Sequence, residues 1–337
     1  MMNLVSRWGA TSTVGVLVLF AAPAVFSQAA DTDGADVKTP EVGVEAQGAQ
    51  SPELTGQVKP EAAQPETGQP TASKGAAPAR ICTAQTGNNY HRYGVLLREK
   101  LKGTVDVEVI ETRGSWENIE RIDSSPRLCD AVIAQEDAYI LHQFEKPSSG
   151  LTMDRTATLF PEYVHLLCPQ TVQAQSLSEL DPEKHSIIVN EYGSGSYITW
   201  RLFRRLNPDY KRFQIVEKGV DEAMLRILDR GAPACFFYVS GLGGHTLNTA
   251  DNTFGAQLRL VGIDDPKLTR KVGRDNRQIY RPSRIDVGVY KKLQTTSIMA
   301  PTVAAVFFLS PEWKARYPEA ARQLASALLQ VIGESND

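Results

Sequence analysis

Two segments of this chain share one pattern, in which a short apolar strand runs through a loop of small and polar residues into a helix. The first segment covers 81–98 and the second covers 187–202. A helix start leaves backbone N–H groups without intrahelical partners, and the helix dipole favours an anion there. Two such loops, each in its own α/β half, predict a small polar or anionic ligand held between two lobes.

Short β-branched runs alternate with helical patterns from residue 80 onward. This alternation occurs twice, first up to about residue 144 and again from about 186 to 239. It predicts an α/β protein with mostly parallel sheets that are covered by helices on both faces. The predicted strands are 80–84, 105–110, 131–134, 163–168, 186–190, 213–216, 235–239, 258–263 and 303–309, and the predicted helices are 91–102, 115–123, 136–144, 196–206, 220–230 and 318–332.

The N-terminal residues 1–29 have the pattern of a removable secretory signal. Arg7 is the only charge before an apolar run over 14–26, and Ser27-Gln28-Ala29 is a small-x-small cleavage pattern. The run is short for a bilayer span, so export is predicted, with an uncleaved membrane anchor as the alternative. Residues 30–79 are rich in Pro, Ala, Gln and Glu and cannot bury enough apolar surface to fold. We expect them to form a disordered tether.

Charge and motif content exclude several functions. The chain has a formal net charge of −3, and its acidic excess lies in the tether, so the folded part is close to neutral. A basic surface for nucleic acid is therefore not predicted. The His and Cys residues are scattered, and the sequence lacks dinucleotide and P-loop fingerprints, so neither a metal nor a cofactor is predicted. Gly193-Ser194-Gly195 lacks the spacing of a nucleophile elbow, so we expect no enzyme.

Seven short motifs follow one another in a fixed order across the folded part. They occupy 83–94, 111–119, 129–138, 159–167, 192–196, 234–241 and 300–306. In this order they resemble the motifs of the TRAP-associated extracytoplasmic immunogenic (TAXI) solute receptors. Within the first motif, Gln85, Asn88 and Asn89 replace loop glycines of that family, and His91-Arg92 replaces Tyr-Pro.

The resemblance implies a type II periplasmic-binding-protein fold with two lobes and a two-strand hinge. Lobe one would contain 80–166 plus 302–337, and lobe two 167–301, with chain crossings near 163–168 and 301–306. The implied function is that of a monomeric periplasmic receptor, which delivers a small carboxylate-type or other polar solute to the membrane subunits of a TRAP transporter. The alternative is a periplasmic sensor or scaffold component that uses this fold without transport.

The candidate ligand-binding residues lie in the two loops and at the ends of strands. In a parallel α/β lobe, residues that end a strand face the crevice at the carboxyl edge of the sheet. Arg113 and Arg92 are candidate partners for a carboxylate, and N-capping is the alternative role for the loop hydroxyls and amides. The predicted set is Thr86, Gly87, Asn88, Asn89, Tyr90, Arg113, Ser115, Gln135, Ser194, Gly195, Ser196 and Tyr238.

The four cysteines of an exported chain invite disulfide bonds, and their spacing alone allows three connectivities. We predict that Cys82 pairs with Cys129 in lobe one, because their strands are expected to be neighbours. By the same argument Cys168 pairs with Cys235 in lobe two. A bond between the lobes would contradict a hinge.

Overall fold

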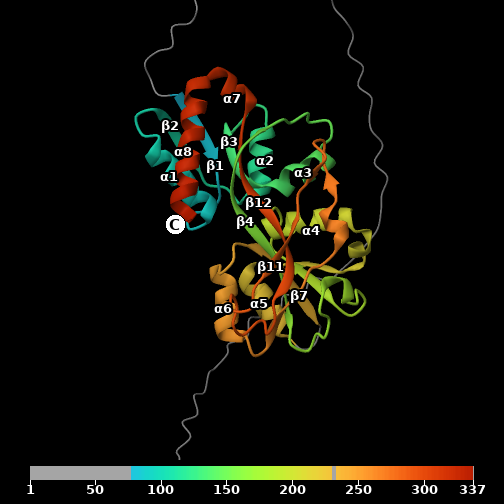
Figure 1. Ribbon diagram of the computed structural model, residues 1–337. Coiled ribbons are helices and arrows are strands. Elements are labelled where there is room, and N and C mark those ends of the chain that lie inside the picture. Colours follow the sequence, from blue (N-terminus) through green and yellow to red (C-terminus); the bar gives the residue numbers. More distant parts are fainter. Residues whose placement is uncertain (1–76, 230–232, 337) are drawn as a thin grey trace, which may run out of the picture. The chain divides into compact units, whose positions relative to one another are not determined.

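The computed structural model describes residues 77–229 and 233–336 (Figure 1). All of them belong to the compact unit Gln69–Asp337. The predicted signal at 1–29 lies outside the described residues, and so does the predicted tether up to residue 76.

The order of elements is the predicted α/β alternation with additional strands and helices. The strands are β1 (Ala77–Cys82), β2 (Val105–Ile110), β3 (Ala131–Gln135), β4 (Asp154–Pro169), β5 (Ser186–Val189), β6 (Ile215–Glu217), β7 (Ala234–Ser240), β8 (Leu258–Val261), β9 (Lys271–Val272), β10 (Arg277–Gln278), β11 (Arg281–Ile285) and β12 (Ile298–Leu309). The α-helices are α1 (Asn89–Lys100), α2 (Ser115–Asp123), α3 (Glu136–Glu145), α4 (Gly195–Leu206), α5 (Val220–Leu228), α6 (His245–Phe254), α7 (Pro311–Arg316) and α8 (Pro318–Asn336).

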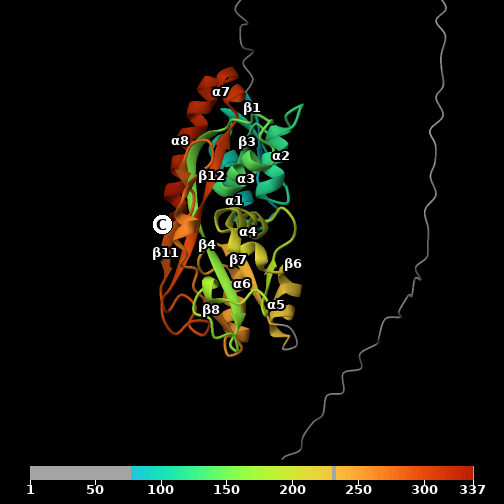
Figure 2. The ribbon, with the colours of Figure 1, turned by 90° about the vertical axis from the view of Figure 1, so that its right-hand side faces the viewer.

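One hydrogen-bonded path of strands runs through both halves of the unit, in the order β2-β1-β3-β12-β4-β7-β5-β6. The strands β1, β2 and β3 are parallel to one another, and so are β5, β6 and β7. These two parallel groups are the sheets of two lobes. Lobe one carries α1, α2, α3, α7 and α8, and lobe two carries α4, α5 and α6 (Figures 1 and 2). The predicted two-lobed α/β fold is confirmed.

Two long antiparallel strands, β4 and β12, connect the lobes. β4 pairs with β12 as far as Tyr163, and from Tyr163 onward it pairs with β7 of lobe two. β12 pairs with β11 up to Thr302 and with β3 of lobe one from Ala305. Both changes of partner fall inside the ranges that the sequence indicates for the chain crossings. The lobes are therefore joined by continuous strands rather than by loops.

The apolar cores lie on both faces of each lobe's sheet. In lobe one, α8 packs beside α1, and Leu324, Leu328 and Val331 are fully buried. In lobe two, Trp200 and Phe203 of α4 are buried in a cluster of aromatic rings. Truncating a buried ring of this kind typically costs about 3–5 kcal/mol. Each lobe therefore has apolar cores of its own.

Several boundaries differ from the sequence prediction. β1 begins at Ala77, so the tether was predicted three residues too long. Pro78 is tolerated because only β2 pairs with β1 at that position, whereas β3 pairs further along at Ile81 and Cys82. β4 begins at Asp154, whereas the sequence predicts a start at 163. The prediction missed the first half of the strand because that half is only partly buried and lacks a strong apolar pattern.

The elements that were not predicted have little apolar content. The helix α6 buries only Leu247, Ala250 and Asp251 among its ten residues. The strands β9 and β10 have two residues each and form a small hairpin of their own. The glycine-rich loop 241–244 connects β7 to α6.

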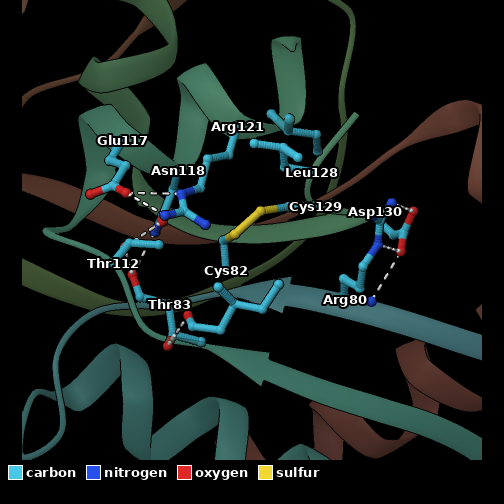
Figure 3. The surroundings of a disulfide bond; sticks show 12 residues. Arg80, Cys82, Thr83, Thr112, Glu117, Asn118, Arg121, Leu128, Cys129 and Asp130 are labelled. Atoms are coloured by element: carbon cyan, nitrogen blue, oxygen red, sulfur yellow. Dashed lines mark hydrogen bonds and ion pairs between the residues drawn. A yellow bond between two sulfur atoms is a disulfide. The ribbon is translucent and has the colours of Figure 1, made fainter. Parts of the chain in front are cut away.

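Both predicted disulfide bonds are present, and each stays within one lobe. Cys82, at the end of β1, is bonded to Cys129, which lies just before β3 rather than on it (Figure 3). Their Cα atoms are 5.9 Å apart. Cys168 on β4 is bonded to Cys235 on β7, with a Cα–Cα distance of 4.4 Å. Neither bond restrains one lobe against the other.

Candidate ligand-binding site

A cleft of about 400 Å³ lies between the two lobes, at the carboxyl ends of their parallel strands. Lobe one contributes the loop before α1, the start of α2 and the end of β3. Lobe two contributes the loop before α4 and the end of β7, and Glu162 of β4 completes the lining. The residues that line the cleft are Ala84, Gln85, Thr86, Gly87, Asn88, Tyr90, Arg113, Gly114, Ser115, Gln135, Glu162, Asn190, Ser194, Gly195, Ser196, Tyr238 and Val239.

The base of the first loop is fixed by a buried hydrogen-bond network beside the Cys82 disulfide (Figure 3). The side-chain amide of Asn118 donates to the backbone oxygens of Thr83 and Ile133, at 2.5 and 2.7 Å. The Thr112 hydroxyl also lies 3.1 Å from the Thr83 oxygen. These bonds hold the end of β1 against α2 and β3, so the loop that follows starts from a defined position.

In the first loop, protein groups already engage two of the predicted ligand-binding side chains. The Thr86 hydroxyl donates to Glu111 at 2.6 Å, and the pKa of Glu111 is lowered chiefly by this bond. The Asn88 side chain caps α1 by accepting from the backbone N–H of Tyr90 at 2.9 Å. Gly87 has a φ of +91°, a left-handed conformation that favours glycine. The capping interpretation therefore applies to Asn88.

The second loop brings lobe two into contact with lobe one. Ser194 caps α4 by accepting from the N–H of Tyr197 at 3.2 Å. A Cβ atom added at Gly195 would lie 2.5 Å from Oε1 of Gln135, which ends β3 of lobe one. A glycine at this position therefore allows the start of α4 to approach Gln135 directly across the cleft.

Ser115 and Ser196 have equivalent positions in the two lobes. The Ser115 hydroxyl accepts from the backbone N–H of Gln135, and the Ser196 hydroxyl accepts from that of Val239, both at 3.0 Å. Each serine thereby ties the start of a helix to the end of a neighbouring strand. Because a hydroxyl that accepts a hydrogen bond keeps its own hydrogen, it is still able to donate. Ser115 is not the N-cap of α2, since Gly114 occupies that position.

Glu162 introduces an acidic group that was not predicted. The Tyr90 hydroxyl donates to its carboxylate at 2.8 Å, and the Gln135 side chain is a second hydrogen-bond partner. Burial raises the pKa of Glu162 to about 7, and the charge of Asp137 adds to this shift. The pKa of Tyr90 is raised well above its usual range, first by burial and then by Glu162.

Four of the candidate residues either lie outside the cleft or have a protein partner close to their polar group. Asn89 and Arg92 do not line the cleft. Arg113 does line it, but its guanidinium Nε donates to Glu117 at 3.0 Å, and its side chain is 72% exposed. Tyr238 lines the cleft, and its hydroxyl lies 3.2 Å from that of Thr246. A carboxylate in the cleft would thus have to compete with Glu117 for Arg113.

Sequence reasoning also missed Asn190, although a usable signal existed. Asn190 directly follows β5, just as Gln135 ends β3 and Tyr238 lies near the end of β7. The rule that selected those two residues applies equally to it. Glu162 offered a weaker signal, because it is an acidic residue in a strand that crosses between the lobes.

Beside the cleft, the lobes meet through α3 of lobe one. Asp137, in the first turn of α3, is fully buried. Its carboxylate accepts from the hydroxyl of Thr199 on α4 at 2.6 Å and from that of Tyr280 at 2.8 Å. Burial raises the pKa of Asp137 to about 6. At the other end of α3, Glu145 forms an ion pair with Arg201 at 2.6 Å. The lobes are therefore in polar contact along this helix.

Within residues 77–229 and 233–336, no cluster of three or more His, Cys, Asp and Glu side chains could hold a metal ion. None of the helices in the described part of the chain combines the length and the apolar character that crossing a bilayer requires.

Comparisons with solved structures find several binding proteins with low identity. Lactococcal OpuAC, in its closed-liganded conformation with glycine betaine, is 13% identical, with a TM-score of 0.44 over 74% of this chain and 83% of that chain. The aliphatic sulphonate binding protein SsuA from Escherichia coli is 12% identical, with a TM-score of 0.47 over 78% and 75%. A TctC solute binding protein from Polaromonas is 14% identical, with a TM-score of 0.45 over 77% and 86%. No curated protein matches the sequence.

Two lobes joined by continuous strands, with a polar cleft between two helix starts, define a two-lobed α/β fold. The chain belongs to the NMT1-like family, whose sequence model matches residues 81–329.

Proposed function

We propose that this protein captures a small polar or anionic organic solute between its lobes and delivers it to a membrane transporter. One observation carries the proposal. The loops before α1 and α4, which come from different lobes, line the same cleft together with Gln135 and Tyr238. Helix starts of this kind favour anionic and hydrogen-bond-accepting groups. The protein acts as a receptor rather than as an enzyme.

The transporter is of the TRAP type, as the resemblance of the seven motifs implies. The receptor is a monomer in the periplasm and is exported by the signal at 1–29. The tether lies between this signal and the folded part of the chain. Lobe one comprises 77–166 plus 302–337, and lobe two comprises 167–301. A solute that contacts both lobes favours the closed arrangement, and the membrane subunits recognise that closure.

Solute identification is the direct test of this function. The full-length exported chain is purified under native conditions, denatured, and the released small molecules are identified by mass spectrometry. We expect one polar organic solute in near-stoichiometric amount, and re-addition of that solute raises the melting temperature of stripped protein. Protein that releases no solute, and whose melting is unchanged by a panel of small polar solutes, would refute the proposal.

Gly195→Val is expected to weaken the binding of the co-purified solute at least about tenfold, roughly 1.4 kcal/mol. A Cβ at this position would lie 2.5 Å from the Gln135 side chain, so α4 of lobe two could not approach β3 of lobe one. Titration calorimetry measures the affinity. Gly241→Val is the matched control, because a Cβ there meets nothing within 4 Å. Equal affinities for the two variants would mean that this approach is not needed for binding.

A periplasmic sensor or scaffold component remains the second candidate. Two contacts favour it: Thr86 is bonded to Glu111 and Arg113 to Glu117, which leaves fewer free groups for a transported solute. Uptake of the co-purified solute by cells that lack this protein separates the two functions. Loss of uptake indicates transport, and unchanged uptake indicates the sensor or scaffold.

A further inference from the structure

The cleft contains buried hydrogen-bond acceptors that the protein's own donors do not satisfy. Gln135 is 2% exposed, and its side chain is a hydrogen-bond partner of Glu162. Because a carboxylate only accepts, the amide nitrogen of Gln135 must be the atom that faces Glu162. Its oxygen Oε1 is buried without a hydrogen-bond partner among the described residues. The buried Oδ1 of Asn190, which also lines the cleft, has none there either.

The cleft also lacks a free positive charge to balance Glu162. Among the described residues that line it, Arg113 is the only cationic one, and its guanidinium is bound to Glu117. Glu162 accepts hydrogen bonds from neutral groups only, namely the Tyr90 hydroxyl and the Gln135 amide. A buried carboxylate is far more stable beside a cation than without one.

These acceptors define the chemistry of a ligand group. Oε1 of Gln135, Oδ1 of Asn190 and the free lone pairs of Glu162 all accept hydrogen bonds, and the ionised form of Glu162 favours a donor group that carries positive charge. A protonated amine has three donors and no acceptor, which fits these requirements. The N–H groups at the starts of α1 and α4 are suited instead to an anionic or carbonyl group elsewhere on the same ligand.

We propose that the solute is zwitterionic and that its protonated amine binds Glu162, with Gln135 and Asn190 as neighbouring acceptors. This inference rests on the proposed receptor function and specifies its ligand class. It differs from a plain mono- or dicarboxylate, which would bring a negative charge to Glu162. Glu162 is then the residue that determines specificity for amines.

The ionisation of Glu162 agrees with this assignment. Its pKa is raised to about 7, because burial and the Asp137 charge together outweigh the hydrogen bonds from Tyr90 and Gln135, which lower it. An ammonium group binds the ionised form, so the affinity for an amine falls as the pH drops below about 7. For a pKa of about 7, the decrease from about pH 8 to about pH 6 is roughly tenfold. A ligand without an amine has no such dependence on Glu162.

Matched ligand pairs test the inference on the full-length protein. Each pair consists of an α-amino acid and the 2-oxo or 2-hydroxy acid with the same side chain, titrated by calorimetry at about pH 8. We expect the amine to bind at least about tenfold more tightly in any pair that binds. Glu162→Gln should remove that preference, whereas Glu183→Gln, which changes a carboxylate that is 82% exposed, should leave it intact.

The wild-type pH profile keeps the inference testable if Glu162→Gln does not fold, because it needs no variant. Oxo or hydroxy acids that bind more tightly than their amines would overturn the inference and leave the receptor function standing. A co-purified solute without an amine would do the same. The receptor function itself fails only when no solute is found and none binds.

Discussion

Replacing Cys168 and Cys235 together with serine is expected to lower the free energy of unfolding by about 2–5 kcal/mol. The bond joins residues 67 positions apart and ties the crossing strand β4 to β7. Without it, the unfolded chain gains the conformational freedom of a long open loop. Both positions are fully buried, so the new hydroxyls also need partners in an apolar environment. Equilibrium unfolding in urea measures the loss.

The Cys82→Ser/Cys129→Ser variant is the matched control for this result. Its bond spans 47 residues, so the entropic loss is nearly as large, but it falls in lobe one. We therefore expect similar stability losses, with protection from amide exchange falling mainly in the lobe that lost its bond. Wild-type protein unfolded under reducing conditions should behave like the variant that lacks all four cysteines. Unchanged unfolding midpoints would show that the bonds contribute little.

Asp137→Ala is expected to destabilise the folded protein by about 2–4 kcal/mol. The substitution removes the acceptor of two hydroxyls, those of Thr199 and Tyr280, and both residues are fully buried. Because the three residues come from both lobes, the loss loosens the contact along α3. Thermal and urea unfolding measure the change. A loss no larger than that of an exposed aspartate such as Asp209→Ala would contradict the expectation.

The pH dependence distinguishes the charge of Asp137 from its hydrogen bonds. Burial raises its pKa from the ordinary 3.8 to about 6, so the folded state binds more protons than the unfolded state between these values. Its contribution to stability is therefore greatest below about pH 4 and is lost as the pH rises through about 6. Asp137→Asn keeps the acceptor oxygen without the charge. Between about pH 4 and pH 7, we expect the free energy of unfolding of the wild type to fall by roughly 3 kcal/mol relative to that of Asp137→Asn. A difference between the two free energies that does not change with pH would contradict this.

The fold was predictable because its main elements carry strong local signals. β5 is a continuous β-branched run, and α8 has apolar residues at helical spacing, such as Leu324 and Leu328. The first half of β4 was missed because partial burial leaves it without such a period. The hairpin β9–β10 was missed because strands of two residues are too short to show an apolar pattern.

The candidate site was predictable where it depends on chain topology. Gln135 and Tyr238 were found because parallel strands bring their carboxyl ends to one edge. The partners of each side chain were not predictable, because they depend on distant segments. The Thr86 hydroxyl is bonded to Glu111, which is 25 positions away in the sequence. Tyr90 is bonded to Glu162, which is 72 positions away. Such contacts follow from tertiary packing, which local sequence patterns do not encode.

The path of β12 has a consequence for the order in which the lobes are completed. Lobe one needs β12 between β3 and β4, yet Ile298–Leu309 is synthesised after nearly all of lobe two. Until β12 is available, the edges of β3 and β4 that it pairs with stay unpaired while the second half of the molecule assembles. We expect chains truncated before β12 to aggregate, because β3 and β4 would then expose unpaired edges to other chains.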